Sequence, residues 1–177
     1  MPTPEGPLSL PFLGLAELLA TSARFQEITD AADETEALDF IHYPTLEIIE
    51  DTFEVPLAII TTELDLEMQL WKRGSPSGKL SSGQLLLELL FPADATQAND
   101  NDRFLKYIND VGVILRQMLD KANTIKPNPS DGYYWNLIQI DQLIAPAKCD
   151  PKLLHATLPD SEDPVDVYAS GWFVRWV

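Results

Sequence analysis

The chain has 177 residues, of which 45% are hydrophobic and 23% charged, so it is long enough to bury the core of one compact domain and short for two. Its 28 Asp and Glu residues against 12 Lys and Arg give a formal net charge of -16 at pH 7, which argues against a protein that binds nucleic-acid phosphates or anionic membranes. The sequence has no run of roughly 20 apolar residues that would span a membrane, no basic secretory signal, and one cysteine, so we expect a soluble protein of a reducing compartment.

The N-terminal region is expected to be an extended arm followed by two helices. Residues 1–10 are proline-rich and predict an arm, which leaves residues 11–177 as a single domain. A helix is predicted from Pro11 to about Thr29, and a short one over residues 34–41 that ends before Pro44, with Leu38 and Ile41 on a shared face. The first helix would bury one face, formed by Leu15, Leu18, Leu19, Ser22 and Phe25.

Three strand candidates follow in the middle of the chain. They cover residues 55–62, 65–73 and 84–91, and the second alternates apolar and polar side chains as a sheet with one covered face requires. The link between the last two, residues 74–83, is rich in Gly, Pro and Ser and predicts a long hairpin loop.

The strongest helix signal runs from about Asp102 to Ala122, where apolar residues repeat at spacings of three and four. The apolar face comprises Phe104, Tyr107, Ile108, Val111, Leu115, Met118, Leu119 and Ala122, and the opposite, polar face comprises Lys106, Asn109, Asp110, Gln117, Asp120 and Lys121. Residues 133–140 and 165–177 are again prone to form strands. This segregated order predicts an α+β fold, with helices packed on one face of a largely antiparallel or mixed sheet.

The sequence predicts no catalytic residue, cofactor or metal. His42, His155 and Cys149 do not form a zinc-binding spacing, and no glycine pattern suits a nucleotide. The tract Gly74–Gly78 has Pro76 where a hydrolase would carry its serine. The many carboxylates are interpreted as solvated surface, with a divalent-ion bridge between subunits as the alternative.

One local basic cluster, Lys72, Arg73 and Lys79, surrounds the predicted hairpin loop, and Trp71 lies beside it. These four residues are the candidate partner-binding residues. The alternative is that the cations only solubilise a protruding turn and that Trp71 is a core anchor.

Several segments resemble small structural proteins of tailed-phage and prophage head–tail modules. They are the first amphipathic segment Leu18–Gln26, the stretch Ala37–Pro44 with its Ile-His-Tyr-Pro ending, and the strand Pro56–Ile60. The order that follows is also similar, with a hairpin ending in Gly83–Phe91, one long helix, and a closing strand Trp172–Trp176. Within that group the chain is most similar to the tail-completion, or tail-terminator, type.

This resemblance implies an α+β subunit that forms a homo-oligomeric ring, commonly a hexamer, on the end of the tail tube. The ring would meet the head–tail connector or neck proteins in a virion that is assembled in the host cytoplasm. Its acidic surface would let DNA pass through the ring without binding it. Two alternatives stay open: another neck or head-closure protein of the same module, and a small acidic module that binds a basic protein partner.

Overall fold

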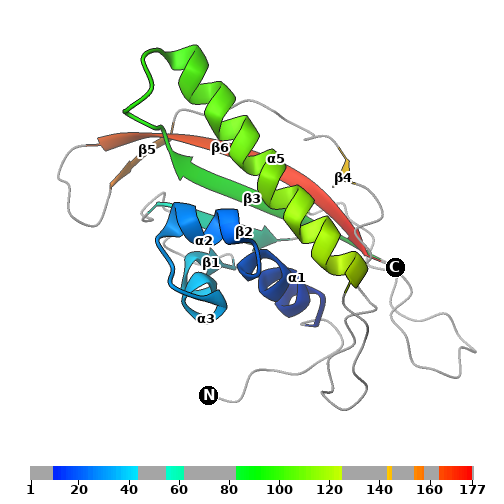
Figure 1. Cartoon of the computed structure of the whole chain (residues 1–177). Coiled ribbons are helices and arrows are strands. Elements are labelled where there is room, and N and C mark those ends of the chain that lie inside the picture. The colour runs from blue at the N-terminus through cyan, green and yellow to red at the C-terminus, as the bar shows by residue number, and fades with distance from the viewer. Residues whose placement is uncertain are drawn as a thin grey trace, which may run out of the picture.

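Helices lie on one face of a mixed sheet in the computed structural model of the chain, which describes residues 10–43, 55–61, 83–124, 143–144, 154–157 and 164–176 (Figure 1). The helical elements are α1 (Leu10–Ala20), α2 (Ala23–Thr29), α3 (Glu34–Ala37), a 3-10 turn η1 (Leu38–Phe40) and α5 (Asp100–Thr124). The strands are β1 (Ile41–His42), β2 (Leu57–Thr61), β3 (Gly83–Pro92), β4 (Leu143–Ile144), β5 (Leu154–Thr157) and β6 (Pro164–Trp176).

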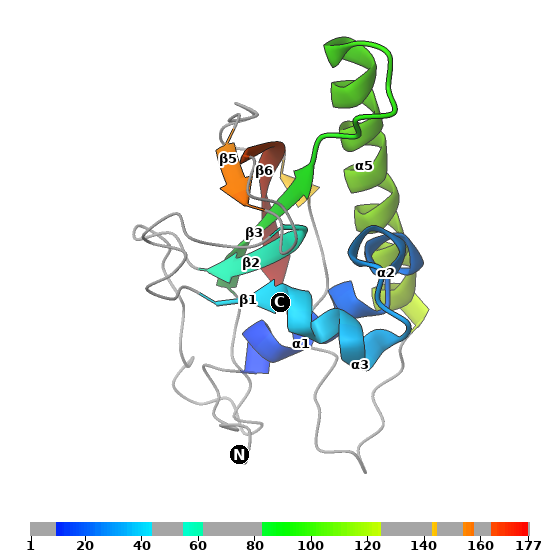
Figure 2. The same cartoon turned by 90° about the vertical axis from the view of Figure 1, so that its left-hand side faces the viewer.

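The strands are ordered β1-β2-β3-β6-β4, and β5 also pairs with β6. Only β1 and β2 are parallel; every other pair is antiparallel. The longest pairing joins β3 to β6, from Gly83 opposite Trp176 to Pro92 opposite Val167. The view in Figure 2 shows α5 and the three N-terminal helices on the same side of these strands. The predicted α+β fold, with helices on one face of a mixed sheet, is therefore confirmed.

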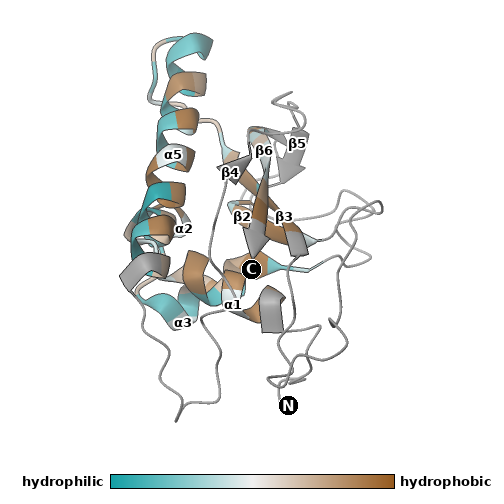
Figure 3. Cartoon of the chain, turned by 90° about the vertical axis from the view of Figure 1, so that its right-hand side faces the viewer, coloured by the Kyte–Doolittle hydropathy of each residue, from teal (hydrophilic) through white to brown (hydrophobic). Residues whose placement is uncertain are grey.

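The main core fills the space between the helices and the sheet. Alternate residues of β3, namely Leu85, Leu87, Leu89 and Phe91, belong to it together with residues of all three longer helices. Figure 3 shows the apolar side of α5 turned toward the sheet and its polar side turned away. A smaller cluster lies on the opposite face of the sheet and contains Val55, Leu57, Ile59, Leu90 and Val167.

A buried polar contact fixes α5 against the two central strands. The hydroxyl of Tyr107 donates to the backbone oxygen of Leu89 (2.9 Å) and hydrogen-bonds to the hydroxyl of Ser170 (2.6 Å). The indole of Trp172 donates to the same serine oxygen (2.9 Å). Buried polar groups need such partners, so the contact favours one position of the helix over β3 and β6.

The single helix predicted over residues 11–29 is two helices in the structure, but its predicted buried face is correct. Helix α1 starts at Leu10, one residue before the expected boundary, and α1 and α2 are separated by Thr21 and Ser22. Ser22 has extended backbone and caps α2 by accepting a hydrogen bond from the N–H of Phe25 (3.2 Å). The five residues of the predicted face are nevertheless all buried, because the chain continues on the same side of the core.

The predicted second helix is also shorter than expected. Its α-helical part ends at Ala37, and after η1 the chain enters β1, where Ile41 pairs with Ala58 of β2. Ile41 is buried as a strand residue, whereas Leu38 is exposed, so these two residues do not share a buried face. The local helical pattern of the sequence could not predict that Ile41 pairs with β2.

Three of the later elements agree with their predicted ranges. Strand β2 lies within residues 55–62, β3 extends residues 84–91 by one residue at each end, and β6 covers nearly all of residues 165–177. Helix α5 exceeds its predicted range by two residues at each end. The predicted arm over residues 1–10 and the predicted loop over residues 74–83 are each wrong by one residue, because Leu10 belongs to α1 and Gly83 to β3. The rest of both segments, the strand over residues 65–73 and the strand over residues 133–140 lie outside the described residues.

Two leucines of α5 provide a matched test of the core. Leu115 is 3% exposed and Leu105 is 62% exposed. We expect Leu115→Ala to lower the free energy of unfolding by about 2–5 kcal/mol, because it leaves a cavity under the helix. Leu105→Ala should change it by less than about 0.5 kcal/mol. Urea denaturation followed by circular dichroism measures both, and equal losses would mean that α5 packs through a different face.

Candidate functional site

The predicted partner-binding residues Trp71, Lys72, Arg73 and Lys79 lie in residues 62–82, outside the described residues. The structure places the two strands that flank this segment. Strands β2 and β3 are antiparallel neighbours, and Thr61 lies opposite Leu86. The segment therefore leaves and re-enters the sheet at adjacent strand ends, as a connection between antiparallel strands does.

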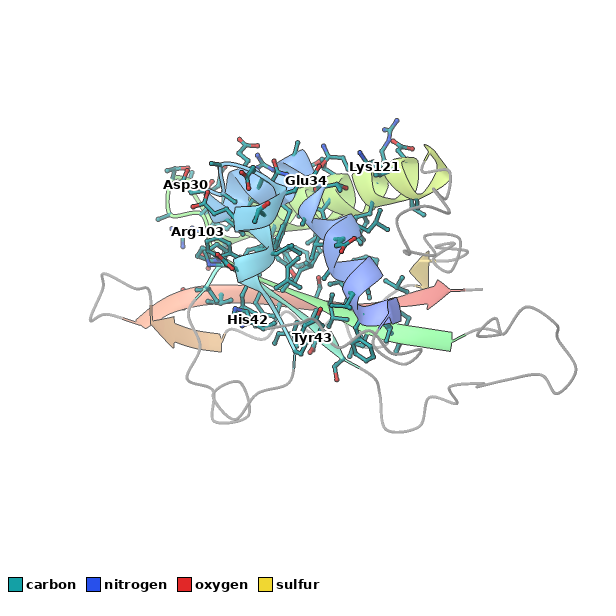
Figure 4. The ribbon with its side chains drawn as sticks, turned by 90° about the horizontal axis from the view of Figure 1, so that it is seen from below. Asp30, Glu34, His42, Tyr43, Arg103 and Lys121 are labelled. Atoms are coloured by element: carbon teal, nitrogen blue, oxygen red, sulfur yellow. The ribbon has the colours of Figure 1, made fainter. Side chains whose placement is uncertain are left out.

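The two histidines lie in different strands of the sheet. His42 is half-buried in β1, His155 is in β5 opposite Asp166 of β6, and Cys149 is not among the described residues. Figure 4 shows His42 next to Tyr43 on the β1 side of the molecule. Over the described ranges, no group of three or more His, Cys, Asp or Glu residues could hold a metal ion.

The most developed polar arrangement joins α2 to α5 through a buried carboxylate, Asp110. Both Nε (3.1 Å) and Nη2 (2.8 Å) of Arg24 donate to Oδ1 of Asp110. Lys106, one turn earlier on α5, places its ammonium 2.9 Å from the other carboxylate oxygen. Arg24 also pairs with Glu27 on its own helix, and this bond and those to Asp110 keep the pKa of the guanidinium above its usual value.

A second contact between the same helices involves the N-terminus of α2. The side-chain oxygen of Gln117 accepts hydrogen bonds from the hydroxyl of Ser22 (2.7 Å) and from the backbone N–H of Arg24 (3.1 Å). It thereby satisfies a donor that the start of a helix leaves unpaired. We call Arg24, Lys106, Asp110 and Gln117 the α2–α5 polar contact.

The α2–α5 polar contact corrects the predicted faces of α5. Asp110 and Gln117 were expected on the polar face opposite the core, but Asp110 is buried and Gln117 is half-buried. They are seven residues apart, so they lie on one side of the helix, and α2 covers that side. The apolar face also includes Ile114, which the predicted list lacks and which is fully buried.

The loop that leads from β3 into α5 is organised by Asp94. Its carboxylate accepts hydrogen bonds from the hydroxyl and the backbone N–H of Thr96, and the Gln97 amide and the Lys106 ammonium lie nearby. The hydroxyl of Thr96 is the largest cause that lowers the pKa of Asp94 to about 2, followed by its N–H. Asn99 then caps α5 by accepting from the N–H of Asp102 (3.0 Å).

A pocket of about 220 Å³ opens between the end of α2, this loop and the first turns of α5. Apolar walls come from both helices and the strand end, and four charged side chains line the same space. The lining residues are Ile28, Phe91, Pro92, Ala93, Asp94, Arg103, Lys106, Tyr107 and Asp110. We call this space the Arg103 pocket. The Nε of Arg103 is buried and has no hydrogen-bond partner among the described residues.

A separate titratable group lies where α1 approaches α3. Burial, followed by the nearby charge of Glu34, raises the pKa of Glu17. Burial is also the main cause that raises the pKa of Tyr43, which packs edge-on against Phe12. The raised pKa values mean that ionisation of Glu17 and of Tyr43 is unfavourable at this position. The two groups are not a pair of nucleophile and base.

The Arg103 pocket was not predicted from the sequence, because its lining comes from α2, β3 and α5. One partial signal was available: Arg103 and Lys106 are two of only 12 basic residues and are three positions apart, so they share one side of a helix. Arg24 pairs with Asp110 of the same helix only in the folded chain.

Comparison of the chain with protein-family models, with curated proteins and with solved structures finds no match. Among the helices that the structure describes, none combines the length and the apolar character needed to cross a membrane. Among the described residues, the Arg103 pocket with its four charged side chains lies next to the fixed contact between α2 and α5.

Replacing Asp110 tests that fixed contact. We expect Asp110→Asn to lower the free energy of unfolding by about 1–3 kcal/mol, because Arg24 and Lys106 lose a buried ionic partner. The matched control is Asp120→Asn on the same helix, because this carboxylate is exposed and its contact with Arg116 is long, at 3.8 Å. The control should change the free energy of unfolding by less than about 0.5 kcal/mol. Similar losses for the two variants in urea denaturation would contradict the assigned contact.

Asp94 predicts a pH dependence with a definite sign. Its folded-state pKa of about 2 lies below the value of 3.8 expected for the unfolded chain. The stabilisation that the charged form of Asp94 gives to the fold is therefore complete when the pH is above the unfolded-state pKa, and it disappears as the pH falls through about 2. The melting temperature of Asp94→Asn should lie below that of the unmodified chain at neutral pH, and the difference should shrink from about pH 4 to about pH 2. A difference that stays constant over this range would show that the charge of Asp94 does not act in the loop.

Proposed function

We propose that the chain is a non-enzymatic structural subunit of a phage or prophage virion. Its role is to form a ring that caps the tail tube and joins it to the head connector. The ring is a homo-oligomer, most simply a hexamer, and its partners are the tail-tube protein and the connector or neck proteins. The protein is assembled in the host cytoplasm and ends in the tail or neck of the virion.

The observation that supports this proposal is the order and pairing of the elements. Three short helices and the turn η1 come first; β2, a 21-residue connection, β3, the long helix α5 and the closing strand β6 then follow in the order that the resemblance relates to tail-terminator proteins, with β1, β4 and β5 as further short strands. The connection is residues 62–82, and the closing strand β6 pairs with β3 over ten residue pairs. A fold alone does not determine function, so the proposal also depends on the charge and on the connection.

The charge of the chain fits a ring through which DNA passes. A net charge of -16 per subunit is multiplied by the number of subunits, and a negative lumen repels phosphates within about 10 Å at moderate salt. DNA then passes without being held by counterion release. The same charge also favours the second candidate, a small acidic module that steers onto a basic partner.

The segment between β2 and β3 is proposed as the docking element. It carries Trp71, Lys72, Arg73 and Lys79, and these three cations are a quarter of the 12 basic residues in the chain. A closed ring needs two different complementary patches on each subunit. A basic segment on a strongly acidic protein supplies one such patch, and the acidic surface supplies its complement.

Neutralising this segment tests the proposal. We expect the triple variant Lys72→Gln, Arg73→Gln, Lys79→Gln to keep the circular dichroism spectrum and melting temperature of the unmodified chain, because these are predicted surface positions. We expect it to lose the ability to form rings and to cap tubes of the tail-tube protein from the same genome. Sedimentation and negative-stain electron microscopy measure both properties.

The control is Arg116→Gln, because Arg116 is an exposed cation of α5 that pairs weakly with Asp120. It should assemble as the unmodified chain does. Normal ring formation and capping by the triple variant would contradict docking through this segment. Tight, salt-sensitive binding to a basic protein by a chain that never self-assembles would favour the acidic module instead.

A further inference from the structure

We propose that residues 44–54, which connect β1 to β2 and lie outside the described residues, dock on the face of the sheet that the described helices leave open. The inference goes beyond the proposed function, because it concerns a contact within one subunit. It closes this sheet face inside the subunit, so contacts between subunits have to use other surfaces.

The second face of the sheet is apolar and buried. Its cluster lies opposite the main core, and each member is between 0% and 6% exposed. The members are Val55, Leu57, Ile59, Leu90 and Val167. All the helices that the structure describes lie on the other face (Figure 2). Neighbouring strands shield a side chain only from its flanks, so burial this deep requires a further layer on the second face.

The pairing of β1 with β2 selects the connection that supplies this layer. The two strands are parallel, with Ile41 opposite Ala58, and residues 43–56 lie between them in the sequence. A connection between parallel neighbours has to return along the whole length of the strands, which takes it across one face of the sheet. Such connections are right-handed in about 98% of cases.

The two views of the fold show which face a right-handed connection crosses. In Figure 1 the helices are nearer to the viewer, β2 runs from left to right, and β1, parallel to it, lies below. Figure 2 again shows β1 below β2, with the helices on one side. A right-handed connection from the lower strand to the upper one then passes behind the sheet, on the second face.

The sequence of the connection fits a cover for an apolar surface. Leu46, Ile49 and Phe53 are separated by three and four positions, and acidic residues occupy positions 47, 50, 51 and 54. This spacing is typical of a segment that buries one side and exposes the other. Val55, where the described chain resumes, already belongs to the cluster on the second face.

The connection between β2 and β3 is the main competing segment for this face. These strands are antiparallel neighbours, and Thr61 lies opposite Leu86. Residues 62–82 therefore leave and re-enter the sheet at adjacent strand ends and do not have to cross either face. The connection between β1 and β2 has to cross one, and this difference assigns the second face to residues 44–54.

The first experiment measures disulfide formation in a Cys149→Ser chain. Ile59→Cys, on the second face, is combined in turn with Leu46→Cys, Ile48→Cys, Ile49→Cys or Phe53→Cys. The matched control replaces Ile59→Cys with Ala58→Cys, because Ala58 is the adjacent residue of β2 and belongs to the main core. A disulfide requires Cα atoms about 4.4–6.8 Å apart. We expect at least one Ile59→Cys pair to oxidise within one chain at least about tenfold faster than its Ala58→Cys counterpart.

Three results of this experiment would overturn the inference. One is equal oxidation rates for the two sets of pairs. Another is disulfides that join two chains, which would assign the sheet face to a second copy. The third is faster oxidation of Ile59→Cys with cysteines at Leu66, Met68 or Leu70, which would assign the face to the connection between β2 and β3.

The second experiment removes the apolar side of the connection and leaves the sheet unchanged. We expect the triple variant Leu46→Ser, Ile49→Ser, Phe53→Ser to bind an apolar-surface dye with several-fold higher fluorescence and to unfold at a lower urea concentration, because the sheet face becomes exposed. The control changes the acidic positions of the same segment, as Glu47→Gln, Glu50→Gln, Glu54→Gln, and should resemble the unmodified chain.

Equal dye binding and equal urea midpoints for the two triple variants would contradict the docked connection. Neither experiment depends on ring formation. A chain that passes both tests and stays monomeric, alone and with tail tubes, keeps the docked connection and contradicts the proposed function. A ring-forming chain that fails them contradicts the docked connection alone.

Discussion

The pairing of β3 with β6 is the constraint on which the rest of the described structure depends. It joins residues 83–92 to residues 167–176, far apart in the sequence, and it makes these two strands the centre of the sheet. Every second residue of β3 faces the helices, so the register of this pair decides which side chains meet α5. The bonds from Tyr107 to Leu89 and Ser170 then fix the helix over both strands at once.

The helical layer is held together by polar contacts as well as by apolar packing. Ser22 and Arg24 of the α2 region meet Gln117 and Asp110 of α5, so the short helix α2 is fixed at two points along the long one. A buried carboxylate needs strong partners, and their geometry allows few alternative positions. The Arg103 pocket lies directly beside this fixed contact and shares Lys106 and Asp110 with it.

The sequence predicted the elements that are determined by local patterns and missed those that depend on distant partners. Helix α5 has a long amphipathic repeat, and β3 and β6 are strongly apolar, so their existence and approximate bounds could be predicted. The break at Ser22 could not, because the serine bonds to a glutamine 95 positions away. Ile41 likewise becomes a strand residue only because β2 is beside it. The Arg103 pocket requires three elements to meet, and its residues are unremarkable in isolation.

The most direct test of the proposed role is native mass spectrometry of the full chain over a range of concentrations, with and without the tail-tube protein of the same genome. Negative-stain imaging of any assembly follows. We expect a closed ring of identical subunits, either alone or on the tube end, with the mass of a small multiple of 19.8 kDa. A monomer under every condition, tail tubes included, would contradict the proposal that this chain is a ring-forming virion subunit.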